Sequence, residues 1–221
     1  LIERRKKGEP VAYLINEKAF WKNVFYVDKD VLIPRPDTEL LIEKILKIYS
    51  NKSQLQILDI GTGSGCIILS LLKEREKDYG TGIDISKKSI NVSKINAKLL
   101  NLSNRTKFFH SSIDNFNIGK YDLIVSNPPY IELLNLKYLE KDVVNFEPKL
   151  ALNGGLDGFS KIKTVISKAS SLLKKKGKLI LEIGFNQKDK VKEMLKKKGF
   201  YVNHTFQDHG NNDRCIISTK I

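Results

Sequence analysis

The chain has 221 residues, of which 41% are hydrophobic and 29% charged, and it carries a formal net charge of +14. These proportions are ordinary for a globular protein and exclude wholesale disorder, a collagen-like fibre and a small disulfide-stapled scaffold. No apolar run approaches the roughly 20 residues that a membrane-spanning helix needs, so we expect no membrane partner. The basic surplus favours polyanions in general but selects none of them. Cys66 and Cys215 lack CxxC or CxxH companions, which argues against a zinc site or a redox motif.

The first 36 residues are predicted to form a small element outside the main domain. Residues 1–7 have the charge pattern of a helix end, and Gly8 is a typical stop. Over residues 11–33, loose alternation of apolar and polar side chains with many aromatics predicts a β-hairpin packed on the main body. The chain begins with Leu1 rather than with Met, so we expect it to be a fragment of a longer protein.

Residues 37–221 alternate between strand and helix patterns. The prolines of residues 34–37 predict an extended turn, after which Asp37 or Thr38 is expected to cap a helix. Further elements are predicted by their periodicity: strands over 56–60, 80–84, 106–109, 121–126 and 178–183, helices over 66–75, 86–99, 160–174 and 187–197, and a final antiparallel pair near 201–206 and 214–219. This alternation indicates an α/β fold with a doubly wound, mostly parallel, seven-stranded sheet.

A glycine-rich segment, residues 59–65, lies between the first predicted strand and its helix. Glycines at this point let the backbone turn tightly and approach a ligand closely. The dinucleotide fingerprint GxGxxG would need glycine where Cys66 stands, and no phosphate-loop lysine follows, so the GxGxG spacing favours S-adenosylmethionine over NAD or a nucleoside triphosphate. The predicted cofactor-binding residues of this loop are Asp59, Gly61, Thr62, Gly63, Ser64 and Gly65.

Two aspartates flank the glycine loop at the ends of predicted strands. Asp84 ends the second strand, where a carboxylate can accept hydrogen bonds from both hydroxyls of a ribose. Asp59 has two interpretations that remain open: it orients the loop amides or the amino group of the cofactor, or its role is purely structural.

The four residues Asn127, Pro128, Pro129 and Tyr130 directly follow the fourth predicted strand, at the edge of the sheet where open α/β proteins bind ligands. The prolines have no N–H donors, so their carbonyls and the Asn127 side-chain oxygen form an acceptor ledge suited to an NH₂ group. Holding a planar amino nitrogen on acceptors and aiming it at a sulfonium methyl is what N-methylation requires. We expect Asn127, Pro128 and Tyr130 to be catalytic and all four residues to hold the substrate, with Tyr130 covering it.

After the ledge comes a long connection over residues 128–158, in which a helix is expected near 133–144. Loops of this length inside a compact domain are usually functional.

With these motifs, the chain resembles the HemK/PrmC family, protein-glutamine N5-methyltransferases that act on peptide chain release factors. The resemblance spans nearly the whole chain and rests on segments 4–14, 32–39, 59–65, 125–131, 146–152, 181–184 and 213–214. The Asn-Pro-Pro-Tyr motif alone is shared with adenine-N6 methyltransferases, whereas Pro-Arg-Pro-Asp-Thr and Phe-Glu-Pro are more particular to this family. Three positions depart from the family: Asn16 stands where glycine is usual, Ala19 where a charged residue is usual, and Ser112 where an acidic residue is common near the adenine.

The resemblance implies the fold of S-adenosylmethionine-dependent methyltransferases and methyl transfer to the glutamine of the Gly-Gly-Gln (GGQ) loop in release factors. It implies that residues 37–221 are the catalytic domain and that the family's helical N-terminal domain is absent before Leu1. Cofactor contacts would come from the glycine loop, Asp84, Asn127 and the residue near Ile113. We further expect a cytoplasmic monomer with no stable nucleic-acid partner.

Two other functions fit part of these motifs. An adenine-N6 methyltransferase acting on DNA or RNA would fit the Asn-Pro-Pro-Tyr motif and the charge, but the chain leaves no room for a target-recognition domain and has no evident aromatic and basic reading surface. A non-catalytic cofactor-binding module would not need both a glycine loop and an acceptor ledge. No Ser/His/Asp or Cys/His nucleophilic pairing is suggested by the sequence.

Overall fold

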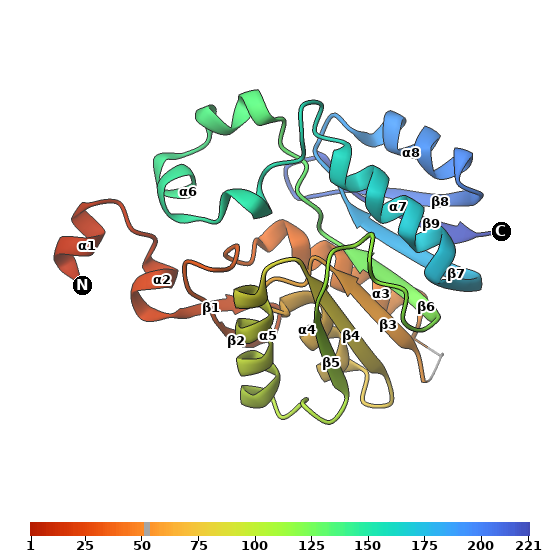
Figure 1. Ribbon diagram of the computed structural model, residues 1–221, viewed down its shortest axis with the longest axis horizontal. Coiled ribbons are helices and arrows are strands. Elements are labelled where there is room, and N and C mark those ends of the chain that lie inside the picture. Colours follow the sequence, from red (N-terminus) through yellow and green to blue (C-terminus); the bar gives the residue numbers. More distant parts are fainter. Residues whose placement is uncertain (51–53) are drawn as a thin grey trace.

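The computed structural model describes residues 1–50 and 54–221, and a seven-stranded sheet forms its centre (Figure 1). The strand order is β5-β4-β3-β6-β7-β9-β8, in which β9 is antiparallel to both neighbours and the other adjacent pairs are parallel. The strands are β3 (Gln56–Ile60), β4 (Tyr79–Asp84), β5 (Thr106–His110), β6 (Tyr121–Ser126), β7 (Leu173–Glu182), β8 (Phe200–Gln207) and β9 (Asp213–Lys220). The predicted doubly wound, mostly parallel sheet is confirmed, including its last antiparallel pair.

Helices cover both faces of this sheet. One face carries α3 (Glu39–Ile48), α4 (Cys66–Glu74) and α5 (Lys87–Leu99), and the other carries α7 (Ser160–Leu172) and α8 (Lys188–Lys197). Successive strand residues point to opposite faces. Ile57 of β3 therefore belongs to the core under α3 and α4, while its neighbour Leu58 belongs to the core under α7. Burial on both sides explains the continuous apolar character of the central strands.

The N-terminal segment contains two short helices and a hairpin: α1 (Ile2–Lys6), α2 (Val11–Ile15), β1 (Glu17–Phe20) and β2 (Asn23–Tyr26). The predicted hairpin is confirmed. The prediction that it extends over residues 11–33 is wrong at its start, because residues 11–15 are helical. The Pro10 carbonyl accepts from the N–H groups of Tyr13 and Leu14, and the buried Tyr13 hydroxyl donates to Val31 O at 2.6 Å. One helical turn is too short to reveal a 3.6-residue period. Asn16 ends it in a left-handed conformation, at a φ of 55°.

Neither Asp37 nor Thr38 caps α3 with its side chain, contrary to the sequence prediction. The residues Pro36–Thr38 form a 3₁₀ turn, η1, and the Thr38 hydroxyl donates to Glu182 Oε2 at 2.7 Å instead. The Thr38 hydroxyl is therefore hydrogen-bonded to Glu182 on β7 and does not cap the helix.

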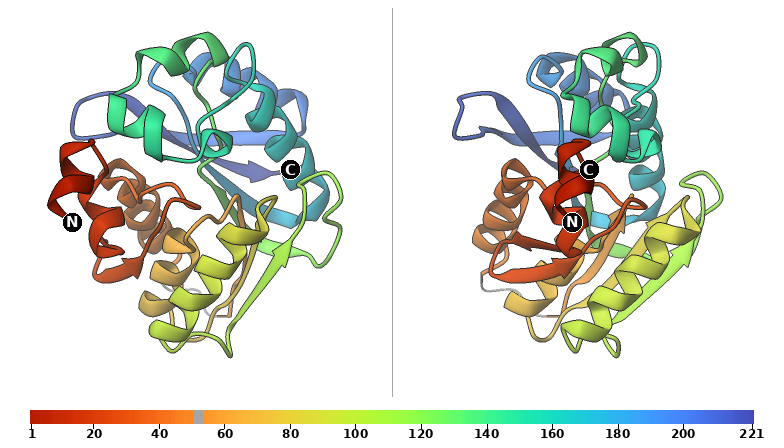
Figure 2. Two further views of the ribbon diagram at one scale, coloured as in Figure 1. Left: turned by 60° about the vertical axis from the view of Figure 1, so that its left-hand side comes forward. Right: turned by 90° about the vertical axis from the view of Figure 1, so that its left-hand side faces the viewer.

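The connection between β6 and α7 holds η2 (Leu133–Tyr138), α6 (Lys141–Phe146) and η3 (Lys149–Ala151) rather than a single helix near 133–144. Leu139 has an extended conformation that separates the first two. In both views of Figure 2 this connection, in green, lies beside the N-terminal segment, in red. Phe146 packs there against a cluster that contains Tyr13 and Val31. Among residues 1–50 and 54–221, no helix is both long and apolar enough to cross a membrane.

Candidate active site

The glycine loop turns sharply at the end of β3. The N–H groups of Gly61 and Thr62 both donate to Ile83 O on the neighbouring strand, at 2.9 and 3.0 Å. Gly61, Gly63 and Gly65 all have positive φ, of 75°, 55° and 81°, which side chains other than glycine rarely adopt. A Cβ atom on Gly61 or Gly63 would meet nothing within 4 Å, whereas on Gly65 it would lie 3.0 Å from Leu69. The first two glycines thus leave open space in front of the loop, and the third lets α4 pack behind it.

That open space belongs to a cavity of about 220 Å³, which we call the loop cavity. Four of the residues predicted to bind the cofactor line it: Gly61, Gly63, Asp84 and Asn127. So does Ile113, with Ser111, Ser112 and Asp114 beside it. The remaining predicted cofactor residues, Asp59, Thr62, Ser64 and Gly65, shape the loop from behind.

Asp84 is braced by the backbone on both carboxylate oxygens. Its Oδ2 accepts from Gly63 N at 3.0 Å, and its Oδ1 accepts from Ser86 N at 2.9 Å. Burial raises the pKa of this carboxyl, and these N–H groups act in the opposite direction. The carboxylate ties the glycine loop to the N-terminus of α5 and still borders the loop cavity, which is the position a ribose-binding group needs.

Asp59 lies completely buried beneath the same loop. Its Oδ2 accepts from the Thr62 hydroxyl at 2.8 Å, so it braces the turn directly. Burial raises the pKa of Asp59 to about 7, only partly offset by that hydroxyl. The geometry favours the structural interpretation of this residue.

The acceptor ledge, residues 127–130, separates the loop cavity from a second one of about 720 Å³, which we call the ledge cavity. The residues that line both are Leu32, Asn127, Pro128, Pro129 and Ala151. Tyr130 lines the ledge cavity but not the loop cavity. The ledge is therefore a thin wall whose two sides face different cavities.

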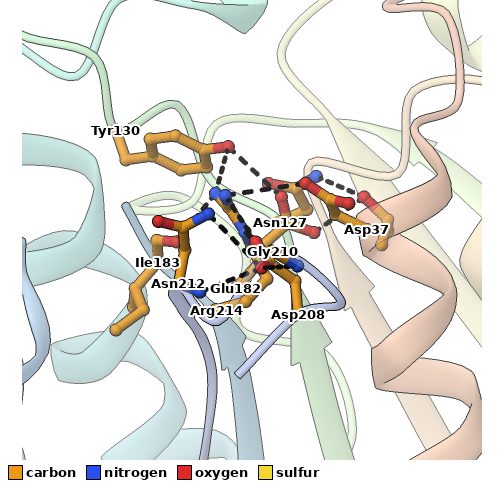
Figure 3. Close-up of polar contacts among 10 residues, drawn as sticks. Asp37, Asn127, Tyr130, Glu182, Ile183, Asp208, Gly210, Asn212 and Arg214 are labelled. Carbon is orange, nitrogen blue, oxygen red and sulfur yellow. Dashed lines mark hydrogen bonds and ion pairs between the residues drawn. The ribbon is translucent and has the colours of Figure 1, made fainter. Parts of the chain in front are cut away.

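A polar network links the ledge to β7 and β9 (Figure 3), and its members Glu182 and Arg214 themselves line the ledge cavity. Asn127 Nδ2 donates to Thr38 Oγ1 at 3.1 Å, and the Tyr130 hydroxyl lies 3.4 Å from Glu182 Oε1. Arg214 donates to the Tyr130 hydroxyl at 3.2 Å and pairs with Asp208 at 2.9 Å. Burial raises the pKa of Glu182 to about 7, against the pull of Arg214 and the Thr38 hydroxyl.

Sequence reasoning did not assign functional roles to Thr38, Glu182 or Arg214. Each lies in a segment that carried the family resemblance, which was the one available signal. Their meeting point is set by the sheet: Glu182 ends β7, Arg214 is the second residue of β9, and β6 ends beside them at the ledge. Asp30, Val31 and Leu32, from the N-terminal segment, line the loop cavity as well, and no local pattern predicted that.

A further set of contacts joins the proline-rich turn of residues 34–37 to the connection between β6 and α7. Glu147, from the Phe-Glu-Pro motif, is buried and accepts from Arg35 Nη2 at 2.5 Å and from Ile33 N at 3.1 Å. It joins the proline-rich turn to the connection after the ledge. The two family-specific motifs therefore meet at the mouth of the ledge cavity, which both Arg35 and Glu147 line.

The residues around the loop cavity fit a nucleoside-bearing cofactor such as S-adenosylmethionine. The open space before Gly61 and Gly63 would be filled by any side chain there, so the loop leaves room for a ligand against bare backbone. Asp84 offers a carboxylate at one side, and apolar side chains such as Val31, Ile85 and Ile113 border the rest.

Comparison with known proteins places the chain among methyltransferases. A family model described as a methyltransferase domain matches residues 51–217. The chain is 41% identical over 224 aligned residues to a release factor glutamine methyltransferase of Buchnera aphidicola subsp. Baizongia pistaciae, covering 100% of this chain and 79% of that protein. It is 36% identical to the protein of that name from Caulobacter vibrioides, covering 99% of this chain and 76% of the other.

The fold has a counterpart among solved structures. The crystal structure of a methyltransferase from Pyrococcus furiosus superposes with a TM-score of 0.68 at 19% identity, over 98% of each chain. The family resemblance seen in the sequence is thereby confirmed, and the chain belongs to the release factor glutamine methyltransferase family.

Proposed function

We propose that this protein transfers a methyl group from S-adenosylmethionine to the side-chain amide nitrogen of the glutamine in the GGQ motif of peptide chain release factors. The observation that carries the proposal is the acceptor ledge between two cavities: one side faces the glycine loop, and the other opens beside Tyr130. The relatives that cover the whole chain bear the name of this activity.

In this proposal each part of the site has a separate task. The glycine loop and Asp84 hold the cofactor, with Asn127 and the backbone near Ile113 at its edges. S-adenosylmethionine supplies an electrophilic methyl on a positively charged sulfur. The Asn127 side-chain oxygen and the Pro128 carbonyl accept the two hydrogens of the substrate amide, and Tyr130 covers its plane.

The ledge compensates for a weak nucleophile. An amide nitrogen has a delocalised lone pair, so rate must come from orientation and from acceptors that strengthen as the nitrogen becomes positive. As the new N–C bond forms, the bond between the sulfonium sulfur and the transferred methyl would break with its electron pair left on the sulfur. The nitrogen would release one proton to solvent, and no dedicated base is needed.

We also propose the setting of this activity. The enzyme works as a cytoplasmic monomer, with residues 37–221 as its catalytic domain, residues 1–36 as an appended element and no stable nucleic-acid partner. Adenine-N6 methylation of DNA or RNA remains the competing function for the Asn-Pro-Pro-Tyr motif, and the overall charge of +14 is the observation in its favour.

Mass spectrometry decides between the two. The protein is incubated with S-adenosylmethionine and, in parallel, with a purified release factor or with duplex DNA and RNA. One added methyl on the GGQ glutamine supports the proposal. Methyl groups on adenine, with none on the release factor, contradict it.

A further inference from the structure

The side-chain amide of Asn127 has two different ends, and only one suits the ledge. Its oxygen accepts hydrogen bonds, whereas its NH₂ group donates them. A substrate NH₂ group needs the oxygen. If the amide turned over, the ledge would present a donor to a donor, so something must fix its orientation.

Thr38 supplies that fixation. Its hydroxyl carries a single hydrogen, which it donates to Glu182 Oε2 at 2.7 Å. Toward Asn127 the hydroxyl can then only accept, and Asn127 Nδ2 donates to it at 3.1 Å. Thr38 is 2% exposed, which leaves water little access as a substitute partner. The Asn127 oxygen is consequently left on the side away from Thr38.

Glu182 also acts on the other end of the ledge. The Tyr130 hydroxyl accepts from Arg214 Nη1 at 3.2 Å, so its own hydrogen is available for Glu182 Oε1, 3.4 Å away. The carboxylate is buried at 1% exposure and accepts from both hydroxyls (Figure 3). An ionised carboxylate can do this because both oxygens are acceptors, while a protonated one must use one oxygen as a donor.

We propose that Glu182, acting through Thr38, is a positioning residue that fixes the amide of Asn127 with its oxygen toward the substrate, and that it orients Tyr130 in the same way. This inference rests on the proposed function. Thr38 lines neither cavity, whereas Glu182 borders the ledge cavity at 1% exposure, and the proposed effect requires neither of them to touch the substrate. Their effect is on turnover, because the donor–acceptor polarity of the ledge depends on the hydrogen that Thr38 gives away.

The test compares Thr38→Val with Thr38→Ser, using release-factor methylation at saturating S-adenosylmethionine. Valine keeps the shape of threonine but removes the hydroxyl, so we expect kcat to fall at least about fivefold while the affinity for S-adenosylmethionine, measured by calorimetry, stays within about twofold. Serine restores the hydroxyl and is expected to stay within about threefold of wild type. Thr106→Val, the same change at the first residue of β5, which lines neither cavity, is the matched control.

Each outcome has one meaning. Wild-type kcat in Thr38→Val, or an equal loss in Thr38→Ser, overturns the inference. If Thr38→Val does not fold, Glu182→Gln decides: its kcat at pH 8 is expected to be reduced at least about fivefold, because the amide of glutamine offers a donor where an acceptor is needed, and an unchanged kcat overturns the inference. If wild-type protein methylates no release factor, the proposed function has failed instead.

Discussion

Asn127 is the residue where the two cavities and the polar network meet. Its side-chain amide is hydrogen-bonded to Thr38, and the residue lines both the loop cavity and the ledge cavity. Sequence reasoning located the residue because of its place directly after a buried strand. It could not identify the residues that support Asn127. Thr38 lies 89 positions from Asn127 along the chain, and Glu182 lies 144 positions from Thr38.

The first residue-scale prediction concerns this side chain. Asn127→Ala removes the oxygen that accepts from the substrate amide, so turnover is expected to drop at least about a hundredfold. The glycine loop and Asp84 remain, so S-adenosylmethionine affinity should stay within about fivefold. Calorimetry and a release-factor methylation assay measure the two quantities, and a variant with wild-type turnover would remove Asn127 from the catalytic role.

A second prediction follows from the buried carboxyls. Burial raises the pKa of Glu182 and of Asp59 to about 7 in the folded protein, above the ordinary values of 4.5 and 3.8. The folded state therefore holds more protons than the unfolded state between about pH 4 and pH 7, and the free energy of unfolding should decrease as pH rises through this window. The charged or titratable groups that face Glu182 are Asp37, Tyr130, Arg214, Cys66 and Cys215.

Glu182→Gln isolates one of these two carboxyls. Its unfolding free energy should decrease less between pH 5 and pH 8 than that of wild type, by about 1 to 3 kcal/mol. Urea denaturation at each pH gives the slopes, and Glu43→Gln, at an exposed position of α3, is the control. Parallel slopes for Glu182→Gln and wild type would show that Glu182 titrates normally.

At the scale of elements, α5 holds the N-terminal segment against the glycine loop through one buried amide. Asn96 Nδ2 donates to Tyr26 O at 2.9 Å and to Ser64 O at 2.8 Å, and its Oδ1 accepts from Tyr26 N at 2.7 Å. From the sequence, Asn96 is only a polar residue in an amphipathic helix. Its role depends on the contact with Tyr26 in the β1–β2 hairpin, which lies 70 positions earlier in the chain. Helical periodicity carries no information about that contact.

Asn96→Ala is predicted to destabilise the protein by about 2 to 4 kcal/mol, because it leaves buried backbone groups of the hairpin and the loop without partners. Hydrogen exchange should increase most in β2 and the glycine loop. The exposed Asn104→Ala is the control and should change stability by less than about 0.5 kcal/mol. Uniform exchange across the molecule, or no loss of stability, would contradict this role.

At the scale of the whole molecule, the order of strands and helices along the chain was the feature best predicted from the sequence. Periodicity placed β3 and β6 at their observed bounds, because strands buried on both faces leave a strong apolar signal. The same rules put the glycine loop and the acceptor ledge at one edge of the sheet. They could not give the paths of residues 11–15 or 133–151, where short turns are fixed by tertiary contacts such as that between Tyr13 and Val31.

The charge of +14 is a property of the whole molecule with its own prediction. Duplex DNA should bind at low ionic strength without sequence preference, and this binding should weaken steeply, by at least about tenfold, between 50 and 200 mM salt. Release-factor methylation should persist at the higher salt concentration. N6-methyladenine formed in such a mixture would favour the nucleic-acid function instead.

The thin wall formed by the ledge has a consequence for inhibitor design. A single compound that joined an adenosine-like part to a glutamine-like amide would occupy both cavities by passing beside Asn127 and Pro128, which line each of them. Once one half is seated, the other half is present at a high local concentration, so the joined compound should bind far more tightly than either half alone. Methyltransferases that share only the glycine loop would bind only the first half, and the amide half would therefore supply the selectivity.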